Sequence, residues 1–143
     1  MPATYDKLGI RFLYPDNWIL DEEEAVGGNG SVAVYSPGGA FWSIVLHPLE
    51  SDPSDLAAAA LQALKTEYEF SEAVPASEKF GRRTVSGYDV SFFYLDLTNT
   101  ALIRAFRTET ATCLVLCQAE DREFAELAAV FRAITTSLLA EKG

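Results

Sequence analysis

The chain has 143 residues, of which 49% are hydrophobic and 22% charged, and its formal net charge is −10. This length and composition suit one globular domain, residues 1–143, with enough apolar side chains for a core. The charge argues against binding of nucleic acid, which requires clustered lysine and arginine. Because the start lacks the basic and apolar regions of a signal peptide and no apolar run is long enough for a membrane span, we expect a soluble, cytoplasmic protein.

The first part of the chain predicts four strands. Residues 10–14 alternate and stop at Pro15, and the polar pair Asp16 and Asn17 favours a turn. We expect this turn to close a hairpin whose return strand is 18–24, followed by a loop over 25–31. Strands over 32–35 and 41–46 come next. Links this short are typical of antiparallel neighbours.

The pattern then changes to a helical period over residues 53–68. Ser51 or Asp52 is suited to cap this helix, and Pro53 is suited to its first turn. Its apolar residues fall on one stripe. A second helix is expected over 120–143, with Glu120 or Asp121 as its cap.

Four more strands are expected between the two helices, over 74–80, 87–97, 101–108 and 112–119, with turns at Asn99 and near Thr110. Pro75 predicts that the first of them is irregular or lies at a sheet edge. Both alternating sets of residues 87–97 are apolar, so this strand is expected at the centre of the sheet, covered on both faces.

The order of the elements is therefore four strands, a helix, about four strands and a helix. Strands in blocks indicate an α+β protein with an antiparallel sheet. We expect six to eight strands, with one helix on each face in an α/β/α sandwich.

The segment "GIRFLYPDNW", residues 9–18, and this element order resemble the PsbP-like superfamily. That superfamily includes the photosystem-associated PsbP proteins, the Ran-binding nuclear-import factor, the bacterial lipoprotein DcrB and bacterial chaperones of secreted effectors. Phe131 followed by Ser137 in the last helix matches the usual ending of these proteins.

The resemblance implies that Phe12, Pro15 and Trp18 form a core signature, with the Trp18 indole beneath the helix layer. It also implies a binding or assembly factor rather than an enzyme. Because members share no common reaction, the fold alone gives little information about function.

Catalytic and metal-binding patterns are weak. Cys113 and Cys117 on one strand would lie about 13 Å apart, too far for a disulfide, so two buried free thiols are expected. His47, the one histidine, precedes Pro48 at a strand end and suits a structural or solvent-facing role. The glycine-rich segment 27–30 lacks the lysine, the serine or threonine and the following helix of a phosphate-binding loop. We expect no catalytic residue, metal site or cofactor.

Charge suggests where a partner would bind. Residues 1–72 contain 12 acidic and 3 basic side chains. Asp21, Glu22 and Glu24 are therefore candidate contacts for a basic partner, although the same charges would serve solubility. An acidic rim at one end of the sheet would also include the carboxylates that follow the fourth strand, namely Glu50, Asp52 and Asp55.

Two further features have alternative interpretations. Phe41 and Trp42 must point to opposite faces of their strand, so Trp42 is either buried under a helix or exposed as a partner contact. The basic residues of 80–83, with Arg104 and Arg107, form either a positive patch or scattered charges paired with acids.

Three functions are consistent with these features. The first is a non-catalytic protein-binding or assembly factor, whose partner has a basic or apolar surface. The second is a chaperone-like binder of an apolar or helical segment of a partner. The third is a small-molecule-binding protein or enzyme with a pocket lined by tyrosine and glutamate.

Overall fold

The computed structural model describes residues 2–24, 30–68 and 71–140. The predicted loop 25–31 and the last residues of the predicted second helix therefore lie largely or wholly outside the described residues. The described part of the chain forms these elements in order: β1 (Pro2–Lys7), β2 (Ile10–Pro15), β3 (Ile19–Glu24), β4 (Gly30–Tyr35), β5 (Phe41–His47), α1 (Pro53–Glu67), β6 (Glu72–Phe80), β7 (Arg83–Tyr94), β8 (Leu97–Arg107), β9 (Thr112–Glu120) and α2 (Asp121–Leu139).

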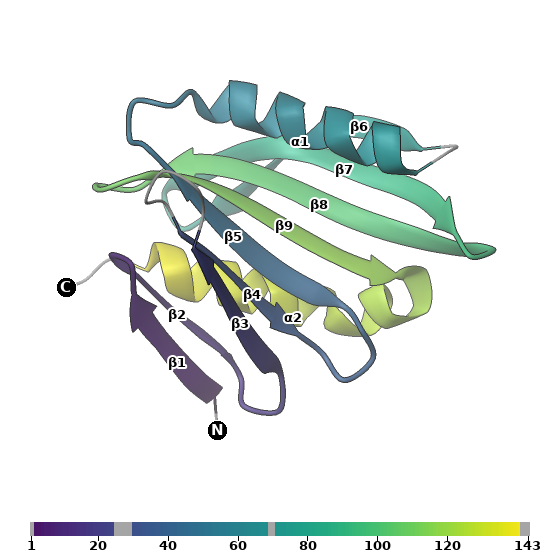
Figure 1. Cartoon of the computed structure of the whole chain (residues 1–143), viewed down its shortest axis with the longest axis horizontal. Helices are drawn as coiled ribbons and strands as arrows, with labels where there is room; N and C mark the ends of the chain where they lie inside the picture. Colours follow the sequence, from purple (N-terminus) through teal and green to yellow (C-terminus); the bar gives the residue numbers. More distant parts are fainter. Residues whose placement is uncertain (1, 25–29, 69–70, 141–143) are drawn as a thin grey trace.

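Seven strands form one antiparallel sheet in the order β3-β4-β5-β9-β8-β7-β6, and β1 and β2 form a separate two-stranded sheet (Figure 1). Helix α1 packs on β7, β8 and β9, whereas α2 packs on β2, β8 and β9. The two helices cover opposite faces of the sheet, because alternate residues of β8 and β9 belong to two separate core clusters. The structure confirms the predicted α+β fold with an antiparallel sheet and two flanking helices.

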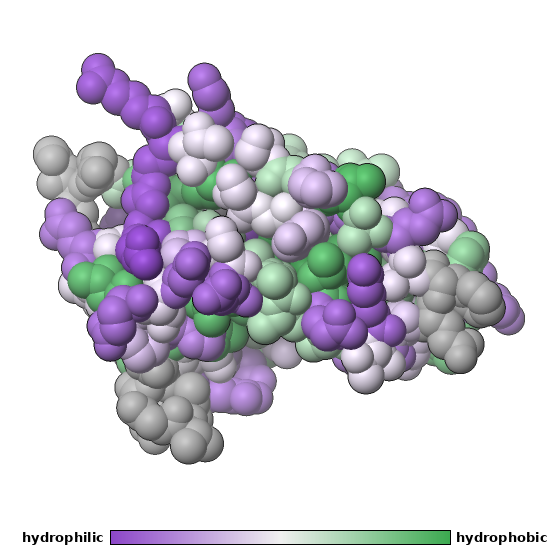
Figure 2. Space-filling view, turned by 90° about the horizontal axis from the view of Figure 1, so that it is seen from above, coloured by the Kyte–Doolittle hydropathy of each residue, from purple (hydrophilic) through white to green (hydrophobic). Residues whose placement is uncertain are grey.

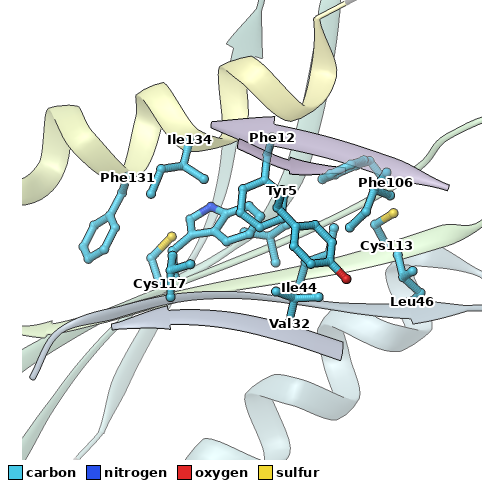
Figure 3. Close-up of a cluster of buried hydrophobic side chains, with 14 of the residues drawn as sticks. Tyr5, Phe12, Val32, Ile44, Leu46, Phe106, Cys113, Cys117, Phe131 and Ile134 are labelled. Atoms are coloured by element: carbon cyan, nitrogen blue, oxygen red, sulfur yellow. The ribbon is translucent and has the colours of Figure 1, made fainter. Parts of the chain in front are cut away.

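The larger core lies between the sheet on one side and α2 with the β1–β2 pair on the other (Figure 3). Phe12, Trp42 and Phe131 are fully enclosed there. The Phe12 and Trp42 rings lie 4.8 Å apart, and Trp42 Nε1 donates a hydrogen bond of 2.9 Å to Thr135 Oγ1 of α2. A buried indole N–H needs such an acceptor, since an unpaired donor would cost stability.

The smaller core lies under α1. Ala57 and Leu64 of this helix pack against buried residues of β7 and β8, including Phe92 and Ile103. Asp52 is the N-cap, and its side chain accepts a hydrogen bond of 2.9 Å from the Ser54 amide, while Pro53 is in the first turn, as predicted.

The start of the chain differs from the prediction. β2 pairs with β1, which the sequence analysis missed, and β3 pairs with β4. The turn closed by the Trp18 amide on the Pro15 carbonyl (3.1 Å) therefore leads from the small sheet into the large one instead of closing a hairpin. At this crossing the Trp18 indole is buried and packs against Phe131 of α2.

The predicted central strand 87–97 is also corrected. β7 lies one strand from the sheet edge, and its chain reversal is at Leu95 and Asp96 rather than at Asn99. The face with Val90 and Phe92 packs in the smaller core, whereas the opposite face is buried only near the start of β7, at Val85. The edge strand is β6, where Pro75 is tolerated as predicted, since one side of an edge strand makes no ladder hydrogen bonds.

Candidate functional site

Helix α1 covers one face of the sheet at β7–β9. The candidate site lies on the same face, at β3, β4 and β5. The register aligns Ile19 with Tyr35 and Tyr35 with Phe41, and it continues to Gln118 of β9. We call this surface the open half-face, and it consists of Ile19, Asp21, Glu23, Ser31, Ala33, Tyr35, Phe41, Ser43 and Val45.

One row of the open half-face is apolar. Ile19 is 72% exposed and Tyr35 38% exposed, and the Tyr35 and Phe41 rings lie 5.8 Å apart. The next row toward the α1 N-terminus has Ala33 and Ser43 at its middle, both half-buried. Small residues beside an apolar row leave room for side chains of a partner to approach the sheet.

The acidic side chains of β3 divide between the two faces of the strand. Asp21 and Glu23 are exposed on the open half-face, in register with Ala33 and Ser31. Glu22 points to the opposite face, so the predicted contacts Asp21 and Glu22 do not share one surface. Of the predicted Glu24, only the strand position is described.

Glu22 has partners within the protein. The Tyr5 hydroxyl donates a hydrogen bond of 2.8 Å to Glu22 Oε2, and Lys7 Nζ lies 3.7 Å from Glu22 Oε1. Burial, this hydrogen bond and the carboxylate charge raise the pKa of Tyr5 above its ordinary value. Glu22 therefore fixes β1 against β3.

The other predicted rim carboxylates have mixed roles. Glu23 pairs with Ser31, and Ser31 pairs with Val45 near the end of β5. Glu50 and α1 follow β5 along the chain, so Glu23 lies at the same end of the sheet. Asp52 uses its carboxylate as the N-cap of α1, and Asp55 lies in the first turn, where a negative charge is favourable. Asp52 and Asp55 at this end of the sheet therefore stabilise the start of α1 and do not act only as surface charges.

Trp42 is the clearest correction to the predicted contact residues. It is fully buried under α2, so it is unable to touch a partner while the fold is intact, and Phe41 takes the open side. Phe12 is also fully buried and Trp18 is 7% exposed, whereas Pro15 is half-buried. The Trp18 ring contacts Phe131 edge to face at 6.0 Å.

The cysteines are buried and free. Burial raises the pKa of Cys113 to about 11 and also raises the pKa of Cys117. Thiols in such surroundings are poor nucleophiles, because the thiolate is the reactive form. His47 is half-buried at the end of β5.

The basic residues form paired interactions rather than one patch. Arg104 is buried, with Nε 2.9 Å from Glu78 Oε1 and Nη2 2.8 Å from Asp89 Oδ1. Arg83 lies over the Phe106 ring, and Arg107 donates to the carbonyls of the segment before α1.

The hollows among the described residues include one beside each helix. One, of about 680 Å³, lies between the start of α1 and strands β6–β8, and Arg107, Ser77 and Tyr88 are in its lining. The other, of about 560 Å³, lies between β2 and α2. We call it the apolar groove, and its lining consists of Pro2, Leu13, Tyr14, Pro15, Asp16, Ala129, Val130, Ala133, Ile134 and Ser137.

Seen from above, hydrophobic areas reach the surface between hydrophilic ones (Figure 2).

Within residues 2–24, 30–68 and 71–140, no three histidine, cysteine or acidic side chains gather as a metal site. In the same ranges, no helix combines the length and apolar character required to cross a membrane.

The sequence analysis did not name Ile19 and Glu23 among the candidate contact residues. The signal was available, because strand alternation places Ile19, Asp21 and Glu23 on the face opposite Leu20 and Glu22. What the sequence did not contain was the position of α1, which leaves that face open.

The order of strands and helices and the sheet with a helix on each face define the PsbP-like fold. No family model and no curated protein matches the sequence. Among solved structures, the chain is similar to the cyanobacterial PsbP (CyanoP) of Synechocystis sp. PCC 6803, with 12% identity, a TM-score of 0.65 and coverage of 95% of this chain and 90% of that one.

A second similar structure is PA94 of Pseudomonas aeruginosa, a protein of unknown function, with 9% identity, a TM-score of 0.53 and coverage of 99% of both chains. At these identities the likeness concerns the fold, and the expected PsbP-like architecture is confirmed.

Proposed function

We propose that the protein is a non-catalytic binding or assembly factor that holds a protein partner against the open half-face. The observation that carries this proposal is the uncovered row of Ile19, Tyr35 and Phe41 beside the exposed carboxylates of Asp21 and Glu23. Apolar surface bordered by charge is a common composition of protein interfaces.

The chemistry of this surface specifies the partner. Burial of an exposed aliphatic side chain such as Ile19 contributes on the order of 1–2 kcal/mol. Asp21 and Glu23 favour lysine or arginine opposite them, which would accelerate association and make it weaker at high salt. The partner surface should therefore contain apolar side chains flanked by basic ones.

The likeness to cyanobacterial PsbP supports the proposal only at the level of fold, because one fold serves many functions. The chaperone-like alternative uses the same surface, with an apolar or helical segment of the partner as its occupant. For the small-molecule alternative, the described linings of the two hollows contain Tyr88 and Tyr14 but no glutamate, and it stays a prediction.

The experiment compares partner recovery from the native host. The tagged wild type is compared with Ile19→Ser and with Asp21→Asn/Glu23→Gln, and recovered proteins are identified by mass spectrometry. The matched control is Glu67→Gln/Glu126→Gln, which changes the charge by the same amount at exposed positions of α1 and α2.

We expect one defined partner with the wild type and the control, and at least tenfold less of it with either open half-face variant. Raising the salt concentration should reduce recovery with the wild type more than with Asp21→Asn/Glu23→Gln. Equal recovery with all four proteins would refute the proposed surface.

A further inference from the structure

The large sheet divides at the end that lies beside the start of α1. The ladder between β7 and β8 ends at the pair of Ser86 with Ala105. Beyond this pair, β7 continues beside β6 as far as Arg83, and β8 continues beside β9 as far as Arg107. The hollow of about 680 Å³ opens at this division and under the first turn of α1, and we call it the basin.

The charged side chains that line the basin are both arginines, Arg83 and Arg107. Asp52 and Asp55 at the start of α1 lie outside the lining, and the Asp52 carboxylate is occupied as the N-cap of the helix. Glu78 of β6 belongs to the opposite face of the sheet, where it is ion-paired. In a chain with a net charge of −10, the basin is therefore locally positive.

Both arginines are held in place by carbonyl groups. Arg107 donates hydrogen bonds from Nε to the Leu49 carbonyl at 3.1 Å and from Nη2 to the Ser51 carbonyl at 3.0 Å. Arg83 donates from Nη2 to the Arg107 carbonyl, and its guanidinium lies 5.5 Å from the centre of the Phe106 ring. Within the described part of the chain, Nη1 of each arginine has no partner. Because a carbonyl group does not neutralise a guanidinium, both arginines keep their charge and these donors for a bound anion.

Hydroxyl groups form much of the remaining polar lining. Ser77 pairs with Ser86 across β6 and β7, and Thr84 lies on the same face two residues before Ser86. Ser54 and Tyr88 add two more hydroxyls to the lining. None of these five hydroxyls donates to another described residue, so all of them are available to a ligand. Hydroxyl and guanidinium donors are the groups that bind phosphate and carboxylate oxygens in proteins.

The composition of the basin indicates one kind of ligand. We propose that the basin binds a small organic anion, whose phosphate or carboxylate group accepts hydrogen bonds from Arg107 and Arg83. A planar guanidinium fits either oxyanion, and the volume is within the range of small-molecule sites. Pro53, Ala57 and Ala105 offer apolar contact for the uncharged part of the ligand. This activity is additional to partner binding at the open half-face, which shares no residue with the basin.

The first test follows the backbone amide signals of the protein by two-dimensional NMR at low salt while a probe is added. The probes are phenyl phosphate and benzoate, which share an aromatic ring and differ in the anionic group, and benzyl alcohol is the uncharged control. We expect saturable shifts of the Ser86 and Arg107 amides, with a Kd of about 1 mM or tighter for at least one of the two anions. Benzyl alcohol should cause none. The anion that binds more tightly identifies the oxyanion that the basin prefers.

The second test changes the charge of the basin without removing a hydrogen bond. Ser77 is exposed on the edge strand β6, so Ser77→Asp should fold as the wild type does and should bind the preferred anion at least tenfold more weakly, because the added carboxylate repels it. Ser77→Asn is the matched neutral control and should bind within about twofold of the wild type.

A third comparison removes one of the two arginines. Arg107→Gln should weaken binding of the same anion at least tenfold. Arg11→Gln, which changes the net charge equally at an exposed position of β2, should bind within about twofold of the wild type.

An absence of saturable shifts with both anions would overturn the proposal. Equal binding by Ser77→Asp and Ser77→Asn would also overturn it, as would shifts confined to residues outside the basin. None of these results bears on the open half-face, which is tested at Ile19, Asp21 and Glu23, so the two proposals succeed or fail separately.

Discussion

Replacement of Trp18 by alanine should remove a large part of the contact between the N-terminal segment and α2. The indole is 7% exposed and meets Phe131 edge to face at 6.0 Å. A buried tryptophan removes roughly 150–250 Å² from water, which at about 25 cal/mol per Å² corresponds to roughly 4–6 kcal/mol. The extended-chain reference overstates this burial, so a loss of about 3–5 kcal/mol is expected, in line with other large-to-small core substitutions.

Urea unfolding followed by far-ultraviolet circular dichroism measures this loss without relying on the deleted fluorophore. Trp18→Phe, which keeps an aromatic ring against Phe131, should lose less than half as much and serves if Trp18→Ala does not fold. A loss below about 1 kcal/mol for Trp18→Ala would refute the reasoning, because a ring in this position would then contribute no more than an exposed one.

Three other substitutions test separate features of the structure. Burial raises the pKa of Cys113 from 9.0 to about 11. The thiol therefore ionises at a lower pH in the unfolded chain than in the folded protein, and the free energy of unfolding should fall as the pH rises from 9 to 11. Urea titrations should show a smaller fall for Cys113→Ala, and an equal fall would contradict the raised pKa. Gly87→Ala would place a Cβ 1.8 Å from the Ile103 carbonyl oxygen, so a loss of more than about 2 kcal/mol is expected in urea unfolding, and a neutral effect would show that the strands separate easily there. Arg104→Met should remove the cation that pairs with Asp89 and Glu78, of which Glu78 keeps Arg132, and should lower the free energy of unfolding by about 1–3 kcal/mol. An unchanged urea midpoint would show that the ion pairs of Arg104 add nothing to stability.

The parts of the fold that follow from local patterns were predicted correctly. Asp52 and Pro53 marked the start of α1, and Pro75 marked the edge strand β6. Each of these signals acts within a few residues, through a capping hydrogen bond or a missing N–H donor. The order of elements then followed without knowledge of long-range contacts.

The errors came where distant segments decide the structure. The apolar residues of 87–97 gave the pattern of a central strand, but Phe93 and Leu95 are exposed on a hairpin end that neighbouring strands do not reach. Trp42 was placed among possible partner contacts because its strand alone does not say which face α2 covers. The acidic run of β3 was treated as one surface, although alternation divides Asp21 from Glu22.

The central claim, that the open half-face holds a protein partner, is tested most directly by site-specific photo-crosslinking in the native host. A photoreactive phenylalanine analogue replaces Tyr35, which is 38% exposed on that surface, and in a separate variant it replaces the exposed Gln62 of α1 as the control. We expect one defined protein adduct at position 35 that is absent at position 62 and is reduced at least tenfold by Asp21→Asn/Glu23→Gln. No adduct at position 35, or the same adducts at both positions, would contradict partner binding at the open half-face.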